Sequence, residues 1–401
     1  MDDRIKAVRL NHEPGKPRYS VERFGITCAR KAQRFHKTFP EYSMTPLMDL
    51  KDLARESGVG HIYVKDESFR FGLNAFKVLG GSYCIGSYMA KCLGQDISEV
   101  SCDILRSRET KKRLGSLTFV TATDGNHGRG IAWTANRLGQ KSVVYMPKGS
   151  ARERLEHIRE LGAEASIKEF NYDDTVRYAS EMAEKNGWIL VQDTAWEGYE
   201  EIPGLIMEGY TTMALEAWKQ LEGIKPTHIF LQAGVGAMAG TVAGFFSSLW
   251  PDEEKPVITI VEPNKADCIY HTAKADDGKL HKVKGAMDTI MAGLACGEPC
   301  LTGWNVLRDY GDWFISIPDR IAAKGMRILG NPVGNDPRII SGESGAATVG
   351  FVVEVLREKT LDLLKTELKL DRESRILCFS TEGDTDRENY RRIVWDGLYS
   401  G

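Results

Sequence analysis

The sequence lacks a strong net charge and a long apolar run, and each absence removes a class of function. The formal net charge is −3 over 401 residues, so no broad basic field would attract nucleic acid or an anionic membrane surface. No apolar run approaches the roughly 18 residues that indicate a membrane span. The charged N-terminal stretch Met1–Lys6 has no apolar core of the kind that a secretory signal needs. We therefore expect a cytoplasmic protein with no nucleic-acid or membrane partner.

The cysteine spacings typical of zinc-ribbon and thioredoxin-type sites are also missing. None of the eight cysteines forms a C-x-x-C motif, which argues against a zinc ribbon or a thioredoxin-type site, and no metal site is predicted. In a large cytosolic chain such residues are expected to be reduced thiols that pack as small apolar side chains. Cys268, Cys296 and Cys300 flank a polar, glycine-rich stretch, so a pair among these three stays an open alternative.

No internal repeat, low-complexity segment or Pro/Gly/Ser-rich linker divides the chain. Short β-branched runs instead alternate with longer amphipathic stretches, which predicts an α/β fold with parallel sheets covered by helices. The number of units favours two sheets over one. The predicted strands are His61–Val64, Leu117–Ala122, Lys141–Met146, Ala165–Glu169, Ile189–Gln192, His228–Gln232, Val257–Val261 and Arg375–Phe379. The predicted helices include Arg152–Leu161, Asp173–Asn186, Gly204–Leu221 and Gly345–Lys359.

The first segment that could carry chemistry is Asn74–Lys77, at the start of a predicted helix. Apolar neighbours and a helix N-terminus disfavour the charged form of a lysine, and a neutral amine is the nucleophile that forms a Schiff base. Taken alone, the segment favours an ordinary surface lysine whose stem lies on apolar surface.

A second segment, Thr123–Gly130, directly follows the predicted strand Leu117–Ala122. A strand, a tight glycine turn and then a helix form the place where α/β proteins bind ligands. Gly125 lets the backbone approach a ligand closely, and Asn126 can donate to a phenolate-like oxygen. The alternative is a plain strand-to-helix turn.

The third segment is the glycine-rich stretch Gln232–Gly240, after the strand His228–Gln232. Consecutive backbone amides that open a helix suit a phosphate. Glu262 ends the next strand, about where a ribose-binding acid would lie in a dinucleotide fold. A nicotinamide-dependent dehydrogenase therefore stays an alternative at this point.

The last segment, Ser380–Asp386, follows the strand Arg375–Phe379 near the C-terminus. Its hydroxyl groups could hydrogen-bond a ring nitrogen, or they could simply cap the following helix.

The order of these four segments, from Lys77 to Thr385, resembles that of the fold-type-II pyridoxal-phosphate (PLP) enzymes. The residues Ala122–Gly130, Asn74–Lys77 and Ser380–Asp386 are, within that group, most similar to those of the diaminopropionate ammonia-lyases. The resemblance implies two lobes, each a mostly parallel twisted sheet flanked by helices. It also implies a large PLP-binding domain of residues 1–83 and 205–401 and a small domain of residues 84–204.

The resemblance assigns the cofactor-binding residues. Lys77 would hold PLP as a Schiff base, and Asn126 would position the cofactor's O3′ oxygen. The phosphate would bind the backbone amides of Gly234, Val235, Gly236, Ala237 and Met238. Thr385, or as a second choice Ser380, would face the pyridine nitrogen.

The resemblance also assigns Lys77, Asp124 and Asp193 as catalytic, and Thr123, Asp124, Gly125 and Asp193 as substrate-binding. Dehydratases of this fold usually carry a small residue where Asp124 stands. A substrate with a β-ammonium group needs a nearby anion, because its extra charge is costly to bury unpaired. Asp193 has an equal alternative as a turn or helix cap.

The function implied is removal of ammonia from 2,3-diaminopropionate, in both D and L forms, giving pyruvate and two ammonia molecules in amino-acid catabolism. A homodimer is expected from the family resemblance alone. One rival is a threonine or serine dehydratase, against which Asp124 argues. A dehydrogenase would leave Lys77 and Asn126 without a task. A PLP-binding module without catalysis also stays open.

Overall fold

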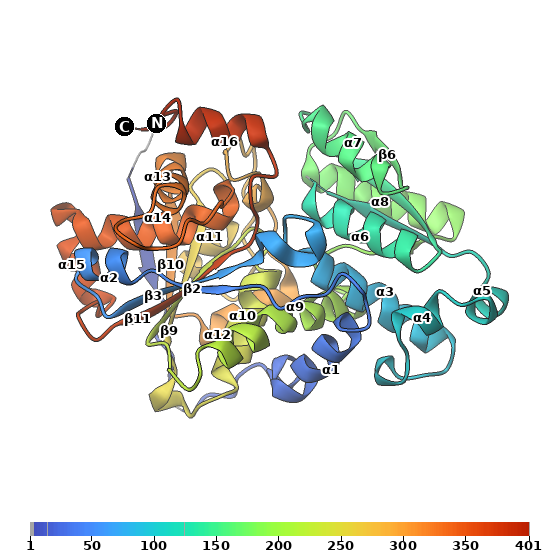
Figure 1. Cartoon of the computed structure of the whole chain (residues 1–401), viewed down its shortest axis with the longest axis horizontal. Helices are drawn as coiled ribbons and strands as arrows, with labels where there is room; N and C mark the ends of the chain where they lie inside the picture. The colour runs from blue at the N-terminus through green and yellow to red at the C-terminus, as the bar shows by residue number, and fades with distance from the viewer. Residues whose placement is uncertain (1–3, 14, 124, 401) are drawn as a thin grey trace.

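The computed structural model describes residues 4–13, 15–123 and 125–400, which form two β-sheets with helices packed around them (Figure 1). The larger sheet has seven strands in the order β1-β10-β9-β8-β11-β3-β2, and the smaller has four in the order β6-β5-β4-β7. The strands are β1 Lys6–Arg9, β2 Leu47–Asp49, β3 His61–Asp66, β4 Thr118–Ala122, β5 Lys141–Met146, β6 Glu164–Ile167, β7 Ile189–Leu190, β8 His228–Gln232, β9 Val257–Pro263, β10 Trp313–Ile317 and β11 Arg375–Ser380.

The strand pairing confirms the α/β prediction with two sheets. All pairs in the smaller sheet are parallel. In the larger sheet β3, β11, β8, β9 and β10 run parallel, and only the edge strands β1 and β2 pair antiparallel. Parallel strands place their carboxyl ends at one edge of the sheet, where α/β proteins bind ligands. All eight predicted strands are present, and β1, β2 and β10 were not predicted.

The four helices whose ranges the sequence predicts are present, within a few residues at each end. The four examples predicted from the sequence correspond to α7, α8, α9 and α14. The helices are α1 Ile26–His36, α2 Lys51–Ser57, α3 Val78–Cys92, α4 Cys102–Leu105, α5 Arg108–Leu114, α6 Asn126–Arg137, α7 Arg152–Glu160, α8 Tyr172–Asn186, α9 Glu201–Gln220, α10 Ala237–Ser247, α11 Cys268–Ala275, α12 Leu301–Tyr310, α13 Asp319–Gly330, α14 Glu343–Arg357, α15 Asp362–Glu367 and α16 Arg387–Val394.

A close crossing of α3 and α9 lies beneath the segment that carries Lys77. A Cβ atom on Gly80 would lie 2.6 Å from both Ile206 and Tyr210, and one on Gly209 would lie 2.4 Å from the Leu79 carbonyl oxygen. Only glycine lets the two helices approach this closely. The start of α3 is therefore fixed in position by packing.

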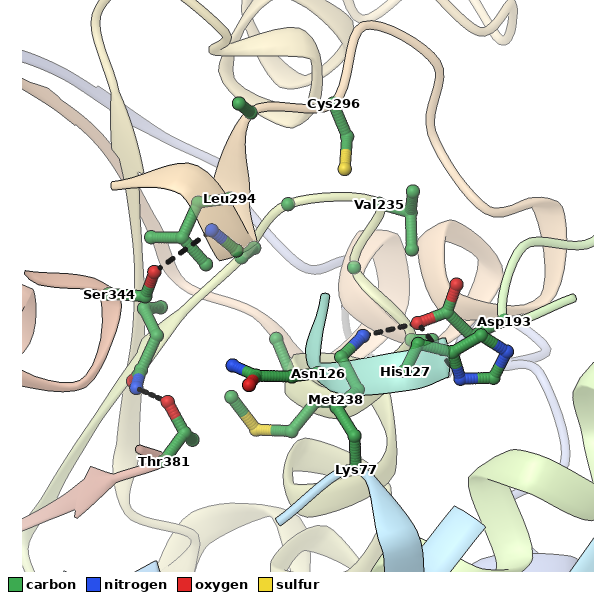
Figure 2. A pocket seen from close by; sticks show the side chains of 18 of the residues that line it. Lys77, Asn126, His127, Asp193, Val235, Met238, Leu294, Cys296, Ser344 and Thr381 are labelled. Atoms are coloured by element: carbon green, nitrogen blue, oxygen red, sulfur yellow. Dashed lines mark hydrogen bonds and ion pairs between the residues drawn. The ribbon is translucent and has the colours of Figure 1, made fainter. Parts of the chain in front are cut away.

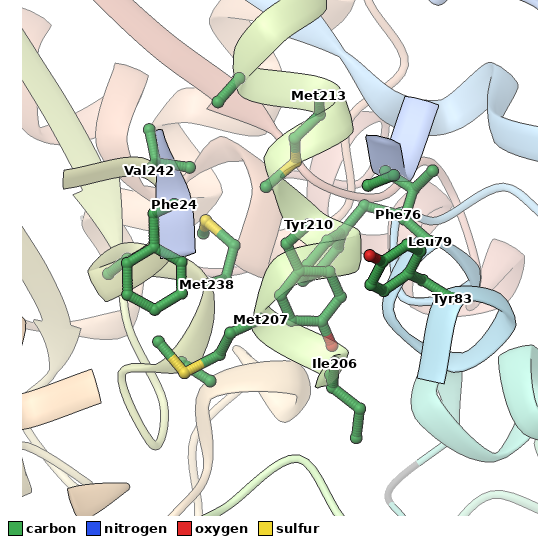
Figure 3. Close-up of a cluster of buried hydrophobic side chains, with 14 of the residues drawn as sticks. Phe24, Phe76, Leu79, Tyr83, Ile206, Met207, Tyr210, Met213, Met238 and Val242 are labelled. Atoms are coloured by element: carbon green, nitrogen blue, oxygen red, sulfur yellow. The ribbon is translucent and has the colours of Figure 1, made fainter. Parts of the chain in front are cut away.

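The hydrophobic core reaches the same place. Figure 3 shows Phe76 and Met238 within a cluster of buried side chains that includes Tyr210. The rings of Phe76 and Tyr210 lie 4.8 Å apart between centroids. Phe76, next to Lys77, and Met238, at the start of α10, are thus part of the close-packed core, which holds their backbone rigidly.

Two further observations concern the described residues. None of their helices combines the length and apolar character that a bilayer crossing requires. All eight cysteines are free thiols, and six of them, Cys268, Cys296 and Cys300 included, are buried.

Candidate active site

A cleft gathers most of the segments that the sequence singled out (Figure 2). It lies at the N-terminal ends of α3, α6 and α10 and beside the carboxyl ends of β8 and β11. The lining side chains come from Phe76, Lys77, Asn126, His127, Tyr172, Asp193, Gln232–Ala239, Ala292–Cys296, Ser344, Thr381 and Glu382.

Lys77 immediately precedes α3, as predicted, and its segment is tied to the turn after β11. The Phe76 N–H donates to the Thr381 carbonyl oxygen at 3.0 Å, and the Gly383 N–H donates to the Asn74 carbonyl oxygen at 3.0 Å. These bonds and the packing of Phe76 aim the Lys77 side chain into the cleft, where it is mostly buried. A surface lysine would have no such support.

Asp193 meets Lys77 inside the cleft. Lys77 Nζ donates to Asp193 Oδ2, and His127 Nδ1 lies 3.9 Å from the same oxygen (Figure 2). His127 is held on its other side, where Nε2 lies 2.8 Å from the Val191 carbonyl oxygen. Burial alone would raise the pKa of the Asp193 carboxyl, but the charges of Lys77 and then His127 outweigh it and bring the pKa to about 2. Asp193 is therefore an ionised partner of Lys77.

Asn126 is the first residue of α6, and its amide points across the cleft. Nδ2 donates to Glu382 Oε2 at 2.5 Å, while Glu382 Oε1 accepts the Ser344 N–H at 3.2 Å. Glu382 is a wall residue that the sequence reasoning missed. Its only sequence signal was its place inside the hydroxyl-rich turn after β11.

The glycine-rich loop after β8 forms one wall of the cleft. Gly236 has φ +92°, a left-handed conformation that favours glycine, and it precedes α10. A Cβ on Gly234 would lie 3.1 Å from Leu294 Cα and 3.2 Å from Cys296 Sγ. The free N–H groups that open α10 thus face the cleft without side chains in the way, which suits a phosphate.

Glu262 does not have the ribose-binding position that a dehydrogenase needs. It is fully buried and accepts the backbone N–H groups of Ile269 at 2.8 Å and Tyr270 at 2.6 Å, at the start of α11. Burial raises the pKa of this carboxyl well above its ordinary value. Because Glu262 binds backbone N–H groups at the start of α11, a dinucleotide-binding site here would lack its ribose-binding carboxylate.

The two hydroxyl residues expected at the pyridine nitrogen are not among those that line the cleft. Ser380 Oγ donates to Ser341 Oγ at 2.8 Å, and Thr385 is 9% exposed. Thr381 is the hydroxyl residue in the wall, and its Oγ1 accepts the Gln232 amide at 2.9 Å (Figure 2). Which hydroxyl faces a bound ring therefore stays a prediction.

The substrate-loop residues are only partly described. Thr123 Oγ1 accepts the N–H groups of Gly125 at 2.9 Å and Gly128 at 3.1 Å, so this buried side chain shapes the turn. Gly125 has φ +154° and leads into α6. Neither is among the residues that line the cleft. Asp124, predicted as catalytic, lies outside the described residues.

A buried lysine–carboxylate pair opposite an amide cradle, in a two-sheet α/β fold, defines an enzyme that anchors a phosphorylated carbonyl cofactor. A family model described as "Pyridoxal-phosphate dependent enzyme" matches residues 38–362. The chain belongs to this family of pyridoxal-phosphate dependent enzymes. The cofactor is therefore PLP, and both the cradle at Gly234–Met238 and the reach of Lys77 fit it.

Relatives with a closer match share one activity. The diaminopropionate ammonia-lyase of Salmonella typhimurium (strain LT2) is 52% identical over 367 residues, which cover 90% of this chain and 91% of that protein. A crystal structure of the Escherichia coli diaminopropionate ammonia lyase in complex with D-serine has a TM-score of 0.91 at 46% identity and covers 99% of this chain and 98% of that one.

Two further matches concern a reaction intermediate of the ammonia-lyase and the sequence identity to a threonine ammonia-lyase. The E. coli enzyme in complex with the aminoacrylate-PLP azomethine reaction intermediate has a TM-score of 0.90 at 47% identity and covers 99% of this chain and 98% of that one. The L-threonine ammonia-lyase of Geobacter sulfurreducens is only 26% identical over 231 residues, 54% of each chain.

Proposed function

We propose that this chain is a PLP-dependent carbon–nitrogen lyase that eliminates ammonia from 2,3-diaminopropionate and yields pyruvate and two ammonia molecules. The observation that carries the proposal is the ionised Asp193 beside Lys77, opposite the amide cradle of the glycine-rich loop. The relatives that are about 50% identical over nearly the whole chain carry this activity.

PLP, when bound, supplies an electron sink that makes the Cα proton of an amino acid acidic. Lys77 would hold the cofactor through Nζ, and the amides of Gly234–Met238 would hold its phosphate. After the substrate displaces it, the Lys77 amine accepts the Cα proton, and Asp193 stabilises the ammonium form that results. Asp193 also keeps Nζ directed into the cleft, and the buried walls exclude bulk water.

Both enantiomers would be accepted because two groups could take the Cα proton from opposite faces. Lys77 would serve one face and Asp124 the other, with Asp124 or Asp193 pairing with the β-ammonium group. The D-serine complex of the E. coli enzyme supports entry of a D-amino acid into a site of this kind.

A threonine or serine dehydratase is the second candidate, because such enzymes share the fold. Two features argue against it. The L-threonine ammonia-lyase relative matches only about half of the chain at 26% identity. The carboxylate of Asp124 also has no task with an uncharged β-hydroxyl group, whereas a β-ammonium group needs it.

We further propose a large cofactor-binding domain of residues 1–83 and 205–401, a small domain of residues 84–204, a homodimeric assembly and a cytoplasmic location. The four strands of the smaller sheet all lie within residues 118–190, which supports the small domain. The two boundaries fall inside α3 and α9, the helices that cross beneath the cleft.

The test of the proposed function is a comparison of substrates. Pyruvate release is measured from D- and L-diaminopropionate, and 2-oxoacid release from serine and threonine, with the purified PLP-loaded protein. The proposal expects both diaminopropionate forms to exceed serine and threonine in kcat/KM by about a hundredfold or more, the discrimination that an unpaired buried charge enforces. Faster turnover of threonine or serine would support the dehydratase instead.

A further inference from the structure

A side-chain hydrogen bond connects the part of the cleft beside the smaller sheet to the part beside the larger sheet. Asn126 opens α6, beside the smaller sheet, and Glu382 follows β11 of the larger one. Asn126 Nδ2 donates to Glu382 Oε2 at 2.5 Å, and both residues line the cleft. A hydrogen bond whose acceptor is a carboxylate is charge-assisted, about twice as strong as one between neutral groups.

Glu382 is held in place from several sides. Its residue is only 5% exposed, and Oε1 accepts the Ser344 N–H at 3.2 Å. Its backbone forms an isolated antiparallel bridge with Ala75, and its carbonyl oxygen accepts the Gly342 N–H at 3.0 Å. The carboxylate therefore cannot turn away from Asn126 without breaking other contacts.

Charges of both signs surround Glu382, with Arg129 as a nearby cation and Glu343 as a nearby carboxylate. Glu343 is buried next to it and accepts a hydrogen bond from Asn389 Nδ2. Burial, followed by the charge of Glu382, raises the pKa of the Glu343 carboxyl to about 7. Asp193 contributes a further carboxylate to the wall of the same cleft. An anionic group that enters the cleft beside Asn126 thus meets the Glu382 carboxylate, which already accepts the hydrogen bond of the Asn126 amide.

We infer that Glu382 competes with the cofactor for the Asn126 amide and thereby limits how tightly the chain holds PLP. This inference rests on the proposed role of Asn126 as the donor to the cofactor's phenolic oxygen. Replacing the carboxylate by an amide keeps the acceptor for the Ser344 N–H but removes the charge. The bond to Asn126 then becomes a weaker neutral one, and PLP binding should tighten about tenfold.

The experiment uses the full chain, stripped of cofactor and titrated with PLP while tryptophan fluorescence is followed. Glu382→Gln is expected to lower the dissociation constant of PLP about tenfold relative to the wild type. The matched control is Asp384→Asn, because Asp384 Oδ1 accepts Asn74 Nδ2 at 3.1 Å in the same turn without lining the cleft. The control should stay within about twofold of the wild type.

Asn126→Ala separates the competition by Glu382 from the donor role of Asn126 on which that competition rests. This variant should weaken PLP binding, and Glu382→Gln should add no gain when combined with it. If Asn126→Ala changes nothing, the role of Asn126 fails and the inference falls with it. If Asn126→Ala weakens binding but Glu382→Gln does not tighten it, or Asp384→Asn tightens it equally, only the competition is refuted.

Circular dichroism and thermal unfolding establish that each variant is folded before titration. Should Glu382→Gln fail to fold, Glu382→Asp serves in its place, because the shorter side chain withdraws the carboxylate from Asn126. Tighter PLP binding is expected there as well, and unchanged or weaker binding would overturn the inference.

Discussion

Asp193→Asn tests how much of the site depends on the carboxylate beside Lys77. The pKa of Asp193 is about 2, whereas the ordinary value is 3.8, even though burial pushes it the other way. That lowered pKa shows that the charges of Lys77 and His127 together outweigh burial and favour the ionised carboxylate. Asparagine keeps the shape but removes the carboxylate that stabilises the Lys77 ammonium form, so kcat/KM for diaminopropionate should fall by roughly 10²-fold or more, the size expected for the loss of a group that assists a proton transfer.

The assay couples pyruvate release to lactate dehydrogenase, with PLP content measured in parallel from absorbance. Asp173→Asn is the matched control, because Asp173 lies on α8 outside the cleft wall. It should keep nearly full activity. Near-wild-type kcat/KM in Asp193→Asn, with normal PLP content, would refute the role given to this carboxylate.

The same interaction has a defined pH dependence. Because the folded pKa of Asp193 is below its unfolded value, its contribution to stability is present above pH 4 and is lost as the pH falls towards 2. The ion pair with Lys77 therefore persists across the neutral range. Any acidic limb of the rate profile above pH 5 should therefore be the same in the wild type and Asp193→Asn, and a limb that is present in the wild type but lost in the variant would contradict this assignment.

Three further variants address the cradle, the substrate loop and the scaffold. Gly236→Asp places a side chain and a negative charge at a left-handed position in the proposed phosphate cradle, so PLP should be lost on dialysis; unchanged PLP content would count against the cradle. Asp124→Asn should reduce turnover of one diaminopropionate enantiomer by ~10²-fold or more and the other less, and equal rates near wild type would reduce Asp124 to a cap. Glu216→Gln leaves Lys65 and Arg70 buried without the carboxylate that bonds them at 2.9 and 2.7 Å, so urea unfolding should show a loss of about 3–5 kcal/mol. A loss below about 1 kcal/mol would show that the buried ion network is dispensable.

The main elements of the fold could be predicted because they carry strong local patterns. β5 was predicted to the residue, and β8 likewise, since each is a run of β-branched and apolar residues between clear turns. β1 and β2 were missed because they have only four and three residues and lie at the edges of the sheet. An edge strand pairs on one side only and lacks the continuous apolar run that reveals a fully buried strand.

The parts of the site that follow a strand end could also be predicted. Lys77, Asn126 and the loop at Gly236 each lie where a strand or turn delivers the chain to the start of a helix, and the structure brings all three to one cleft. Glu382 could not be predicted, because its role depends on the cross-lobe approach of Asn126, 256 positions away in the sequence. Side-chain direction in an irregular turn has no local periodicity to reveal it.

We propose that Lys77 carries PLP and works as the amine of an ammonia-lyase. The most direct measurement is borohydride reduction of the PLP-loaded protein, followed by peptide mapping, together with pyruvate release by Lys77→Ala. We expect a reduced pyridoxyl group on Lys77 alone, and a folded Lys77→Ala variant that releases no pyruvate from diaminopropionate above background. A pyridoxyl group on another lysine, or wild-type turnover by Lys77→Ala, would contradict it.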